Sequence, residues 1–218
     1  MKSSFDCRYQ YWQKLERMLA LSKVAVTGGL SCGKTSVCHF FKRFGAYVVS
    51  ADDIVHRLLS PTTNLGQRVI LLIGSDIVIN NQIDRSKISQ KVFKQPLLLK
   101  SLENLLHPAV QDEIKKHYDL ANQQENRKKL FVAEIPLLFE ARLENFYDTV
   151  ISVVADLDKS KKRFQKATGK SIEEYERRSA RQLPIDEKAH RADYVIVNDS
   201  NLYDLEIETK KLMNILTH

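Results

Sequence analysis

The sequence is poor in cysteine and has no long apolar run. Its three cysteines, Cys7, Cys32 and Cys38, form no Cys-x-x-Cys pair and no even set. This pattern argues against a disulfide framework and predicts reduced thiols in the cytoplasm. No stretch reaches the roughly 18 apolar residues that a transmembrane helix needs, so we expect no membrane partner. The first residues hold no apolar core of signal-peptide length, so we also expect no signal peptide.

Glycine is also scarce, and its placement is informative. Only 7 of the 218 residues are glycine, and three of them lie in "VAVTGGLSCGKTSV". The stretch predicts a strand at Val24–Val26, a Gly28-x-x-x-x-Gly33-Lys34-Thr35 loop, and a helix running toward Phe44. This is the P-loop pattern in its strand–loop–helix context. We expect backbone amides to hold the phosphates of a nucleoside triphosphate, Lys34 to reach the terminal phosphates and Thr35 to hold Mg²⁺.

The sequence carries an excess of positive charge, with a net charge of +7. The positive charge concentrates between Lys159 and Arg191, where glutamates interrupt it. A basic segment beside a P-loop suits a polyphosphate substrate. The rival reading is a nucleotide-dependent protein that binds RNA or DNA. Because no basic stripe with interleaved aromatic residues is present, we expect no nucleic-acid partner.

Four further apolar runs of strand length follow the P-loop: "GAYVVS", "KKLFVAEIPLL", "DTVISVVADL" and "ADYVIVND". Apolar strands separated by helices predict a parallel sheet that is covered on both faces. We therefore predict a five-stranded α/β P-loop fold. Its core comprises residues 23–57, 128–157 and 192–218, preceded by an N-terminal extension, 1–22. A helical insertion, 58–127, follows strand two, and a basic insertion, 158–191, follows strand four. Pro96 suits a helix start, and Pro108 should bend or restart the last helix of the first insertion.

Acidic residues end two of the predicted strands, on the side where open α/β sheets bind ligands. The second strand ends in "SADD", where Asp52 is either a catalytic carboxylate or a helix N-cap. The third ends in Glu134, which either supports a metal ion or makes a structural hydrogen bond. In the basic insertion, Arg163, Arg178 and Arg181 are candidates for binding phosphates through bidentate forks.

The motifs together resemble the dephospho-CoA kinase family. The similar pieces run in order from Val24: "VTGGLSCGKT", "VVSADDIVHRLL", "IDRSKISQKVF", "LLHPAV", "IPLLFE", "RRSARQ" and "ADYVIVN". The resemblance implies transfer of the γ-phosphoryl group of ATP, with Mg²⁺, to the ribose 3′-hydroxyl of dephospho-CoA. It also implies that 58–127 is the acceptor domain and that 158–191 is a lid.

The same resemblance implies roles for individual residues. Residues Ser31, Cys32, Gly33, Lys34, Thr35 and Ser36 would hold the ATP phosphates together with Gly28. Asp52 would be the base for the ribose hydroxyl, and Arg178 and Gln182 match a lid motif. Arg85 and His107 belong to the insertion that receives the acceptor, and Asn198 matches an asparagine near the nucleotide base. Departures from the family pattern are Ser50 and Ala167, where Asp and Arg are usual.

Other readings remain open at this point. The nearest alternative is another P-loop small-molecule kinase or nucleoside monophosphate kinase. A switch GTPase is disfavoured because the base-reading Asn-Lys-x-Asp pattern is absent. We expect a monomer with a mobile lid that orders when ATP binds. Cys32 is either an oxidation-sensitive thiol, activated by a helix N-terminus and Lys34, or an inert small residue.

Overall fold

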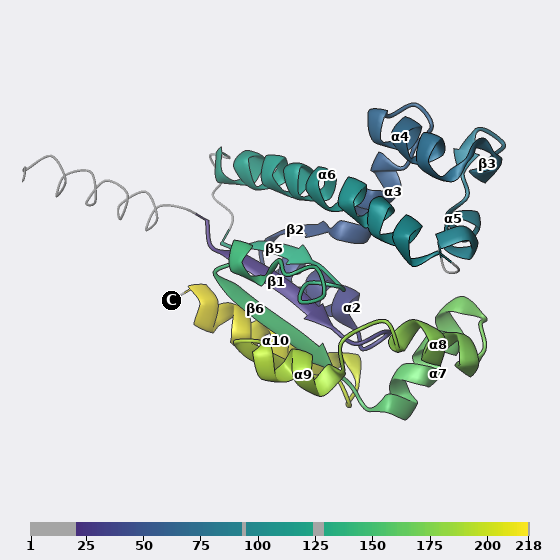
Figure 1. Ribbon diagram of the computed structural model, residues 1–218. Helices are drawn as coiled ribbons and strands as arrows, with labels where there is room; N and C mark the ends of the chain where they lie inside the picture. Colours follow the sequence, from purple (N-terminus) through teal and green to yellow (C-terminus); the bar gives the residue numbers. More distant parts are fainter. Residues whose placement is uncertain (1–20, 93–94, 124–128, 218) are drawn as a thin grey trace, which may run out of the picture.

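A five-stranded parallel sheet forms the centre of the molecule in the computed structural model, which describes residues 21–92, 95–123 and 129–217 (Figure 1). The strand order is β2-β5-β1-β6-β7. The strands are β1 (Lys23–Gly28), β2 (Tyr47–Ser50), β5 (Phe131–Glu134), β6 (Thr149–Val154) and β7 (Tyr194–Val197). The predicted five-stranded parallel sheet is therefore confirmed. The predicted extension, 1–22, and Cys7 lie outside the described residues except for the last two positions, Leu21 and Ser22.

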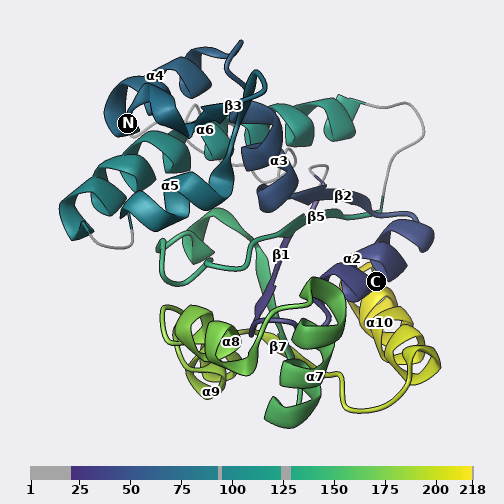
Figure 2. The ribbon, with the colours of Figure 1, turned by 90° about the vertical axis from the view of Figure 1, so that its right-hand side faces the viewer.

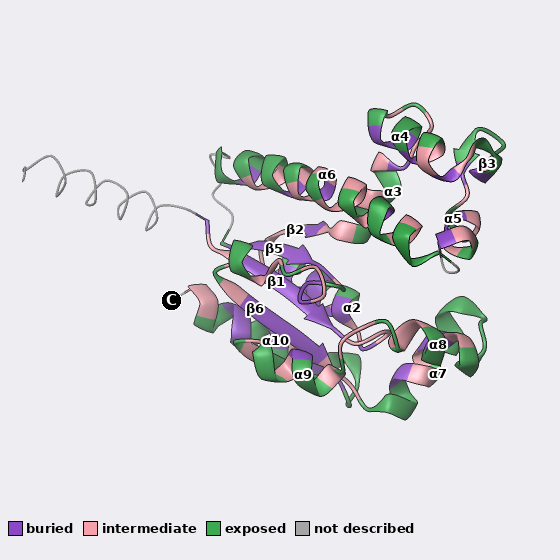
Figure 3. Cartoon of the chain, in the orientation of Figure 1, coloured by how far each residue is buried: buried purple, intermediate pink, exposed green. Residues whose placement is uncertain are grey.

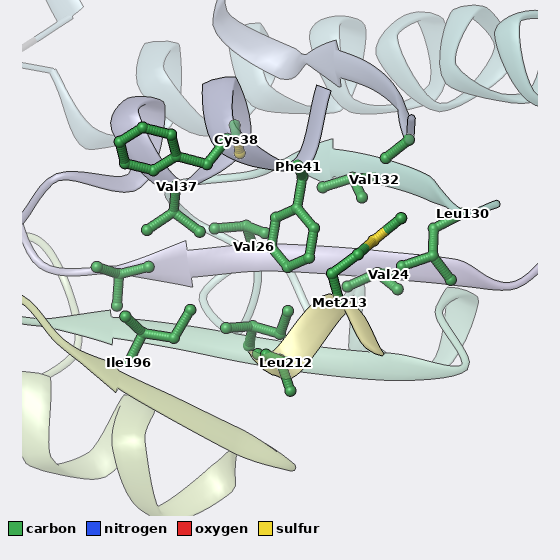
Figure 4. Close-up of a cluster of buried hydrophobic side chains, with 14 of the residues drawn as sticks. Val24, Val26, Val37, Cys38, Phe41, Leu130, Val132, Ile196, Leu212 and Met213 are labelled. Carbon is green, nitrogen blue, oxygen red and sulfur yellow. The ribbon is translucent and has the colours of Figure 1, made fainter. Parts of the chain in front are cut away.

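Helices cover both faces of the sheet, as continuous apolar strands require. On one face α2 (Lys34–Arg43) and α10 (Leu202–Thr217) pack against Val24 and Val26 of β1. Figure 4 shows Phe41 of α2 and Met213 of α10 close to these valines. On the other face α3 (Ala51–Leu58), α6 (Pro96–Gln123) and α9 (Ile185–Arg191) contact the sheet. Because side chains alternate along a strand, Ala25 faces this second layer. Figure 3 shows the central strands β1, β5 and β6 as mostly buried, while the edge strands β2 and β7 are partly exposed.

The first insertion has a core of its own. It contains α4 (Asn64–Ile73), η1 (Ser75–Ile77), the hairpin β3 (Val78–Ile79) and β4 (Gln82–Ile83), and α5 (Arg85–Val92). Helix α6 starts at Pro96, as predicted, and continues through Pro108 without a restart. Packing on both sides of this proline holds the helix together. Leu102 lies in the core of the insertion, and Val110 packs in the layer beneath the sheet.

The second insertion divides into two parts. Helices α7 (Leu157–Thr168) and α8 (Ile172–Ser179) pack on each other through Phe164 and Tyr175, whose ring centroids lie 5.6 Å apart. Helix α9 instead contacts β1 and β6. The pair α7–α8 lies at the end of the sheet toward which the strand arrows point, on the same side as α5 (Figures 1 and 2). The short helix η2 (Glu144–Phe146) precedes β6. Within the described ranges, no helix is long and apolar enough to cross a membrane.

Candidate active site

The loop between β1 and α2 is tightly turned. Gly28 and Gly33 have φ angles of 139° and 103°, and Ser31 has a φ of 55°. A Cβ atom on Gly28 would lie 2.1 Å from the carbonyl oxygen of Val153, and one on Gly33 would lie 2.1 Å from Nδ2 of Asn198. Both positions therefore require glycine for conformation and for space. The loop wraps the N-terminus of α2, whose free amide groups favour an anion.

Lys34 is the first residue of α2, and its side chain is 8% exposed. Its ammonium donates to the carbonyl oxygen of Gly29 at 2.7 Å and to that of Gly28 at 3.4 Å. These contacts hold a compact positive charge against the loop, at the wall of a cavity. Phosphate oxygens are stronger acceptors for an ammonium than neutral carbonyl groups.

Thr35 and Glu134 form an oxygen-rich pair beside the loop. The parallel register of β1 and β5 places Glu134 next to Val26, and the Thr35 hydroxyl donates to Oε1 of Glu134 at 2.8 Å. Burial raises the pKa of Glu134, while the Thr35 hydrogen bond and the Lys34 charge oppose that rise. The charges of Asp52 and Asp53 contribute to the rise, so several carboxylates share this end of the sheet.

A cavity of about 610 Å³ brings the predicted catalytic residues together. From the core it is lined by Lys34, Thr35, Asp52 and Glu134, and from the second insertion by Arg163, Arg178, Arg181 and Gln182. Asp52 is exposed in the first turn of α3 and lines the cavity, whereas Asp53 does not. Ser50 is the N-cap of this helix, because its hydroxyl accepts from the amide of Asp53 at 3.3 Å. The N-cap alternative for Asp52 is therefore wrong, and its carboxylate is available to a ligand.

The second insertion contributes a wall of guanidinium groups to the cavity. Arg178 donates through Nε to Oε1 of Glu174 at 2.8 Å, and Arg177 is paired with the same carboxylate. Desolvation lowers the pKa of Arg181, and the charges of Arg177 and Arg178 lower it further. The negative charges of a bound polyphosphate would relieve this crowding of cations.

Asn198 and Arg163 connect helix α7 to the P-loop. Nδ2 of Asn198 donates to the carbonyl oxygen of Cys32 at 2.7 Å. Nη2 of Arg163 donates to the backbone oxygen of Asn198 at 3.0 Å and to its Oδ1 at 3.4 Å. Nη1 of Arg163 is buried and has no hydrogen-bond partner among the described residues, although Arg163 lines the cavity. The Asn198 amide is thus occupied in supporting the loop.

The environment of Cys32 bears on its two predicted alternatives. Its side chain is 1% exposed, and Lys34 Nζ lies 3.9 Å from its sulfur. Burial nevertheless raises the pKa of the thiol, and the Lys34 charge offsets this rise only in part. Of the two alternatives for Cys32, burial and the raised thiol pKa favour the inert small residue, because desolvation outweighs the neighbouring ammonium. Cys38 is buried as well, and burial raises its pKa too. The side chain of Cys32 packs in the protein interior, and its backbone is part of the P-loop.

A second cavity, of about 1130 Å³, separates α5 from α8. Its cationic lining residues are Arg85, Lys170, Arg177 and Arg178. Arg178 lines both cavities, so the two spaces meet at this side chain. Arg85 therefore faces the predicted lid. His107 is half-buried in α6 and lines neither cavity.

Two residues near the site were missed at the sequence level. Lys188 of α9 is fully buried, and its ammonium lies 2.8 Å from Oε1 of Glu140. The sequence of α9, "IDEKAHR", is too polar to indicate that a lysine faces the sheet. Glu140, the last residue of "IPLLFE", was the available signal in the sequence. A buried carboxylate after a strand near the P-loop requires a cationic or hydrogen-bonding partner, which here is Lys188.

The described residues offer no complete metal cage. Among them, no group of three or more His, Cys, Asp or Glu side chains is placed to hold a metal ion. The Thr35 hydroxyl and the Glu134 carboxylate are nevertheless hard oxygen donors, of the kind that Mg²⁺ prefers. Mg²⁺ commonly completes its shell with water and substrate phosphates, so two protein oxygens beside a phosphate loop fit this ion.

Comparisons with known proteins agree with this geometry. A family model described as dephospho-CoA kinase matches residues 22–204. The dephospho-CoA kinase of Protochlamydia amoebophila is 50% identical over 195 residues, which cover 89% of this chain and 96% of that protein. The crystal structure of a Thermus thermophilus protein is similar with a TM-score of 0.77 and 30% identity, over 91% of this chain and 100% of that one. The dephospho-CoA kinase from Campylobacter jejuni gives a TM-score of 0.65 and 27% identity, with 89% and 96% covered.

Proposed function

The chain belongs to the dephospho-CoA kinase family, and we propose from this premise how its residues carry out the reaction. The enzyme transfers the γ-phosphoryl group of ATP to the ribose 3′-hydroxyl of dephospho-CoA, giving coenzyme A and ADP. One observation carries the assignment of roles: the P-loop, Asp52, Glu134 and the lid arginines line one cavity. Phosphoryl transfer needs positioning and charge neutralisation more than covalent chemistry, and this cavity supplies both.

The P-loop binds the ATP phosphates through backbone amides between Gly28 and Ser36. Lys34 then exchanges the carbonyl oxygen of Gly29 for oxygens of the β- and γ-phosphates, because an anion is the stronger acceptor. Asn198 keeps the loop in its turned form by holding the Cys32 carbonyl. We therefore assign Asn198 a positioning role, in place of a contact with the nucleotide base. Arg163 supports Asn198 through Nη2 and offers its unpartnered Nη1 to a phosphate.

Thr35 and Glu134 would hold Mg²⁺. When bound, the ion neutralises charge on the β- and γ-phosphates. The hydroxyl of Thr35 would be a direct ligand, and the carboxylate of Glu134 would orient this hydroxyl through the hydrogen bond between them.

Replacing Glu134 by glutamine should separate stability from activity. Since burial raises the pKa of Glu134, the folded state binds its proton more tightly than the unfolded state does. This side chain therefore costs stability as the pH rises above the ordinary glutamate pKa, and the full cost is present above its raised pKa. Glu134→Gln should therefore raise the thermal midpoint at pH 7. Turnover should fall by about tenfold or more. The stability gain should shrink as the pH falls toward the ordinary glutamate pKa; a gain that stays constant from pH 7 to pH 4 would show that ionisation of Glu134 is not its cause.

Asp52 is the base that orients and deprotonates the ribose hydroxyl. It is exposed, it lines the cavity, and it is not used as a helix cap. The acceptor enters along the second cavity, where Arg85 faces the lid, and its ribose reaches Asp52 at the junction marked by Arg178. Gln182 lies on the lid side of this junction. His107 remains a candidate for acceptor contacts farther along α6.

The helices α7 and α8 act as the lid. Arg178 is held by Glu174 in this structure, and it would turn toward the phosphates when ATP offers a stronger partner. Closure excludes water, which otherwise competes with the acceptor for the phosphoryl group.

Arg178→Lys is expected to lower kcat by about tenfold or more while changing the affinity for ATP little. Lysine keeps the charge but lacks the planar fork that binds two oxygens. The measurement compares kcat with the Kd for ATP, with Lys162→Arg, at an exposed lid position, as the control. Hydrogen exchange across 158–179 should slow when an ATP analogue and the acceptor are bound; a lysine variant with full turnover argues against this role.

We also propose that the enzyme is a cytoplasmic monomer without a nucleic-acid partner. The described cysteines, Cys32 and Cys38, carry free thiols, as a reducing compartment predicts. Arg178 and Arg181 of the basic lid line the first cavity, where phosphates account for their charge. Size-exclusion chromatography with light scattering, and RNA binding as a function of salt, test these two statements.

The reaction itself is tested by a coupled ADP-release assay with and without dephospho-CoA. ADP formation should require dephospho-CoA and should be far slower with shikimate, nucleoside monophosphates or free pantetheine. Efficient turnover of a nucleoside monophosphate would favour the alternative kinase assignment. The product should carry its new phosphate on the ribose 3′-oxygen, which ³¹P NMR distinguishes from a 2′-phosphate.

A further inference from the structure

Lys188 is a buried lysine in a helix that lies against the sheet. Its side chain is 0% exposed, and its ammonium lies 2.8 Å from Oε1 of Glu140 and 2.9 Å from the carbonyl oxygen of Pro136. Burial lowers the pKa of Lys188, and the hydrogen bond to Glu140 opposes this change. A buried ammonium is tolerated only where such partners replace water. These contacts link α9 to the segment that follows β5.

Both ends of this network reach the active-site cavity. Pro136 lines the cavity, and its carbonyl oxygen also accepts from the Thr27 hydroxyl of β1 at 3.3 Å. Oε1 of Glu140 also accepts from the backbone amide of Leu183 at 2.8 Å. Leu183 directly follows Gln182, which lines the cavity. One carboxylate therefore fixes a wall of the cavity and the point where the lid returns to the core.

The P-loop rests on the same helix. A Cβ atom on Gly29 would lie 3.2 Å from Cδ1 of Ile185, at the start of α9. The first turn of α9 is thus packed against the loop, while its buried lysine is bound to Pro136 and Glu140. Any shift of α9 would change the spacing between the P-loop and the lid arginines.

We propose that Lys188 and Glu140 are positioning residues for phosphoryl transfer, and that together they form the fixed end against which the lid closes. The pair sets where Gln182 and Arg181 stand relative to the P-loop. This inference rests on the kinase function proposed above and on the lid role of α7 and α8. It assigns the pair an orienting task and not mainly a stabilising one, because a buried ion pair often adds little net stability.

A double variant separates orientation from stability. Glu140→Gln combined with Lys188→Met removes both charges at similar volume, so no buried charge is left unpaired. We expect the thermal midpoint to stay within about 4 °C of wild type. We expect kcat to fall by about tenfold or more, because small displacements of positioned groups slow a reaction strongly. The KM for ATP should change much less. The single variant Lys188→Met should be the least stable, because it leaves the Glu140 carboxylate without its ammonium.

The chain offers a matched control pair. Arg191 of α9 binds Oε1 of Glu144 at 2.5 Å and so ties the same helix to the same segment. Neither residue lines the active-site cavity. Glu144→Gln with Arg191→Met should leave kcat within about twofold of wild type. If kcat falls as much in this control as in the Glu140–Lys188 double variant, the Lys188–Glu140 pair only anchors α9, and the proposed positioning role is wrong. Wild-type kcat in the Glu140–Lys188 double variant would overturn the proposal outright.

Hydrogen exchange provides a test that does not depend on a folded variant. In the wild-type protein the Leu183 amide should be protected both without ligands and with an ATP analogue and dephospho-CoA, because Glu140 accepts from it. The amides of α7 and α8 should gain protection only on binding. A Leu183 amide that exchanges as fast as the ligand-free lid contradicts the fixed end. The assay of wild-type protein with ATP and dephospho-CoA judges the kinase function separately, and its failure would leave the protection of the Leu183 amide in the ligand-free protein unchanged.

Discussion

Replacing Lys34 by alanine is expected to lower kcat by about 100- to 1000-fold while leaving the fold intact. The ammonium neutralises charge that grows on the bridging and terminal phosphates in the transition state, and no other lysine in the described part of the chain lines the active-site cavity. The side chain makes its hydrogen bonds to loop carbonyls, so its loss removes little packing from the core. The measurement is steady-state turnover in the ADP-release assay, together with thermal unfolding.

Lys42→Ala is the control for Lys34→Ala. Lys42 is exposed in the last turn of the same helix, so its removal should leave turnover unchanged. If Lys34→Ala keeps activity within tenfold of wild type, the loop binds a nucleotide without taking part in the transfer. If it loses activity only because α2 unfolds, the thermal midpoint will fall with it.

The second large effect is expected at Asp52. Asp52→Asn should lower kcat by about 100- to 10,000-fold, the range that a positioned general base contributes, while the Kd for ATP stays nearly constant. The amide keeps the shape of the side chain but cannot accept the proton of the ribose hydroxyl. Binding of an ATP analogue, measured by calorimetry, and turnover at saturating dephospho-CoA give the two quantities separately.

Asp53→Asn is the matched control, one residue along the same turn. Asp53 donates its amide to Ser50 but does not line the cavity, so its neutralisation should have a small effect on kcat. If Asp53→Asn is the more damaging change, the assignment of the base within "SADD" is displaced by one residue. Equal losses in both variants would indicate a general effect of negative charge near Glu134, whose pKa both aspartates help to raise.

The fold and the phosphate loop were predictable because their signals are local. Each strand is a short run of apolar residues, and the P-loop motif lies within one short segment of the sequence, from Gly28 to Thr35. The backbone there has few alternatives, since Gly28 and Gly33 adopt positive φ angles that other residues avoid. A strand that ends in Glu134 predicted a carboxylate beside the loop, because parallel strands bring their carboxyl ends to one edge.

The structure decided alternatives that the sequence left open, both at short range and between distant segments. The sequence allowed Asp52 to be a helix cap, and only the Ser50 hydroxyl bound to the Asp53 amide assigned the cap elsewhere. Asn198 lies 166 residues from the Cys32 carbonyl that it holds, and no local pattern reports such a pairing. The pKa of Cys32 depends on how completely it is buried, and this burial outweighs the effect expected from its neighbour Lys34.

The sequence by itself determined the kind of chemistry, and the tertiary structure decided which side chains surround it. A chain can encode a phosphate loop in about ten residues, because backbone geometry and one lysine suffice. Burial, by contrast, is a property of the whole packed chain. The charged group of Lys188 is buried although its helix has a polar sequence, and it pairs with Glu140. Glu140 in turn accepts from the amide of Leu183, which lies 43 residues farther along the chain. Local sequence preferences carry no information about such partners. The interaction free energy of a buried contact arises only when folding removes both segments from water together.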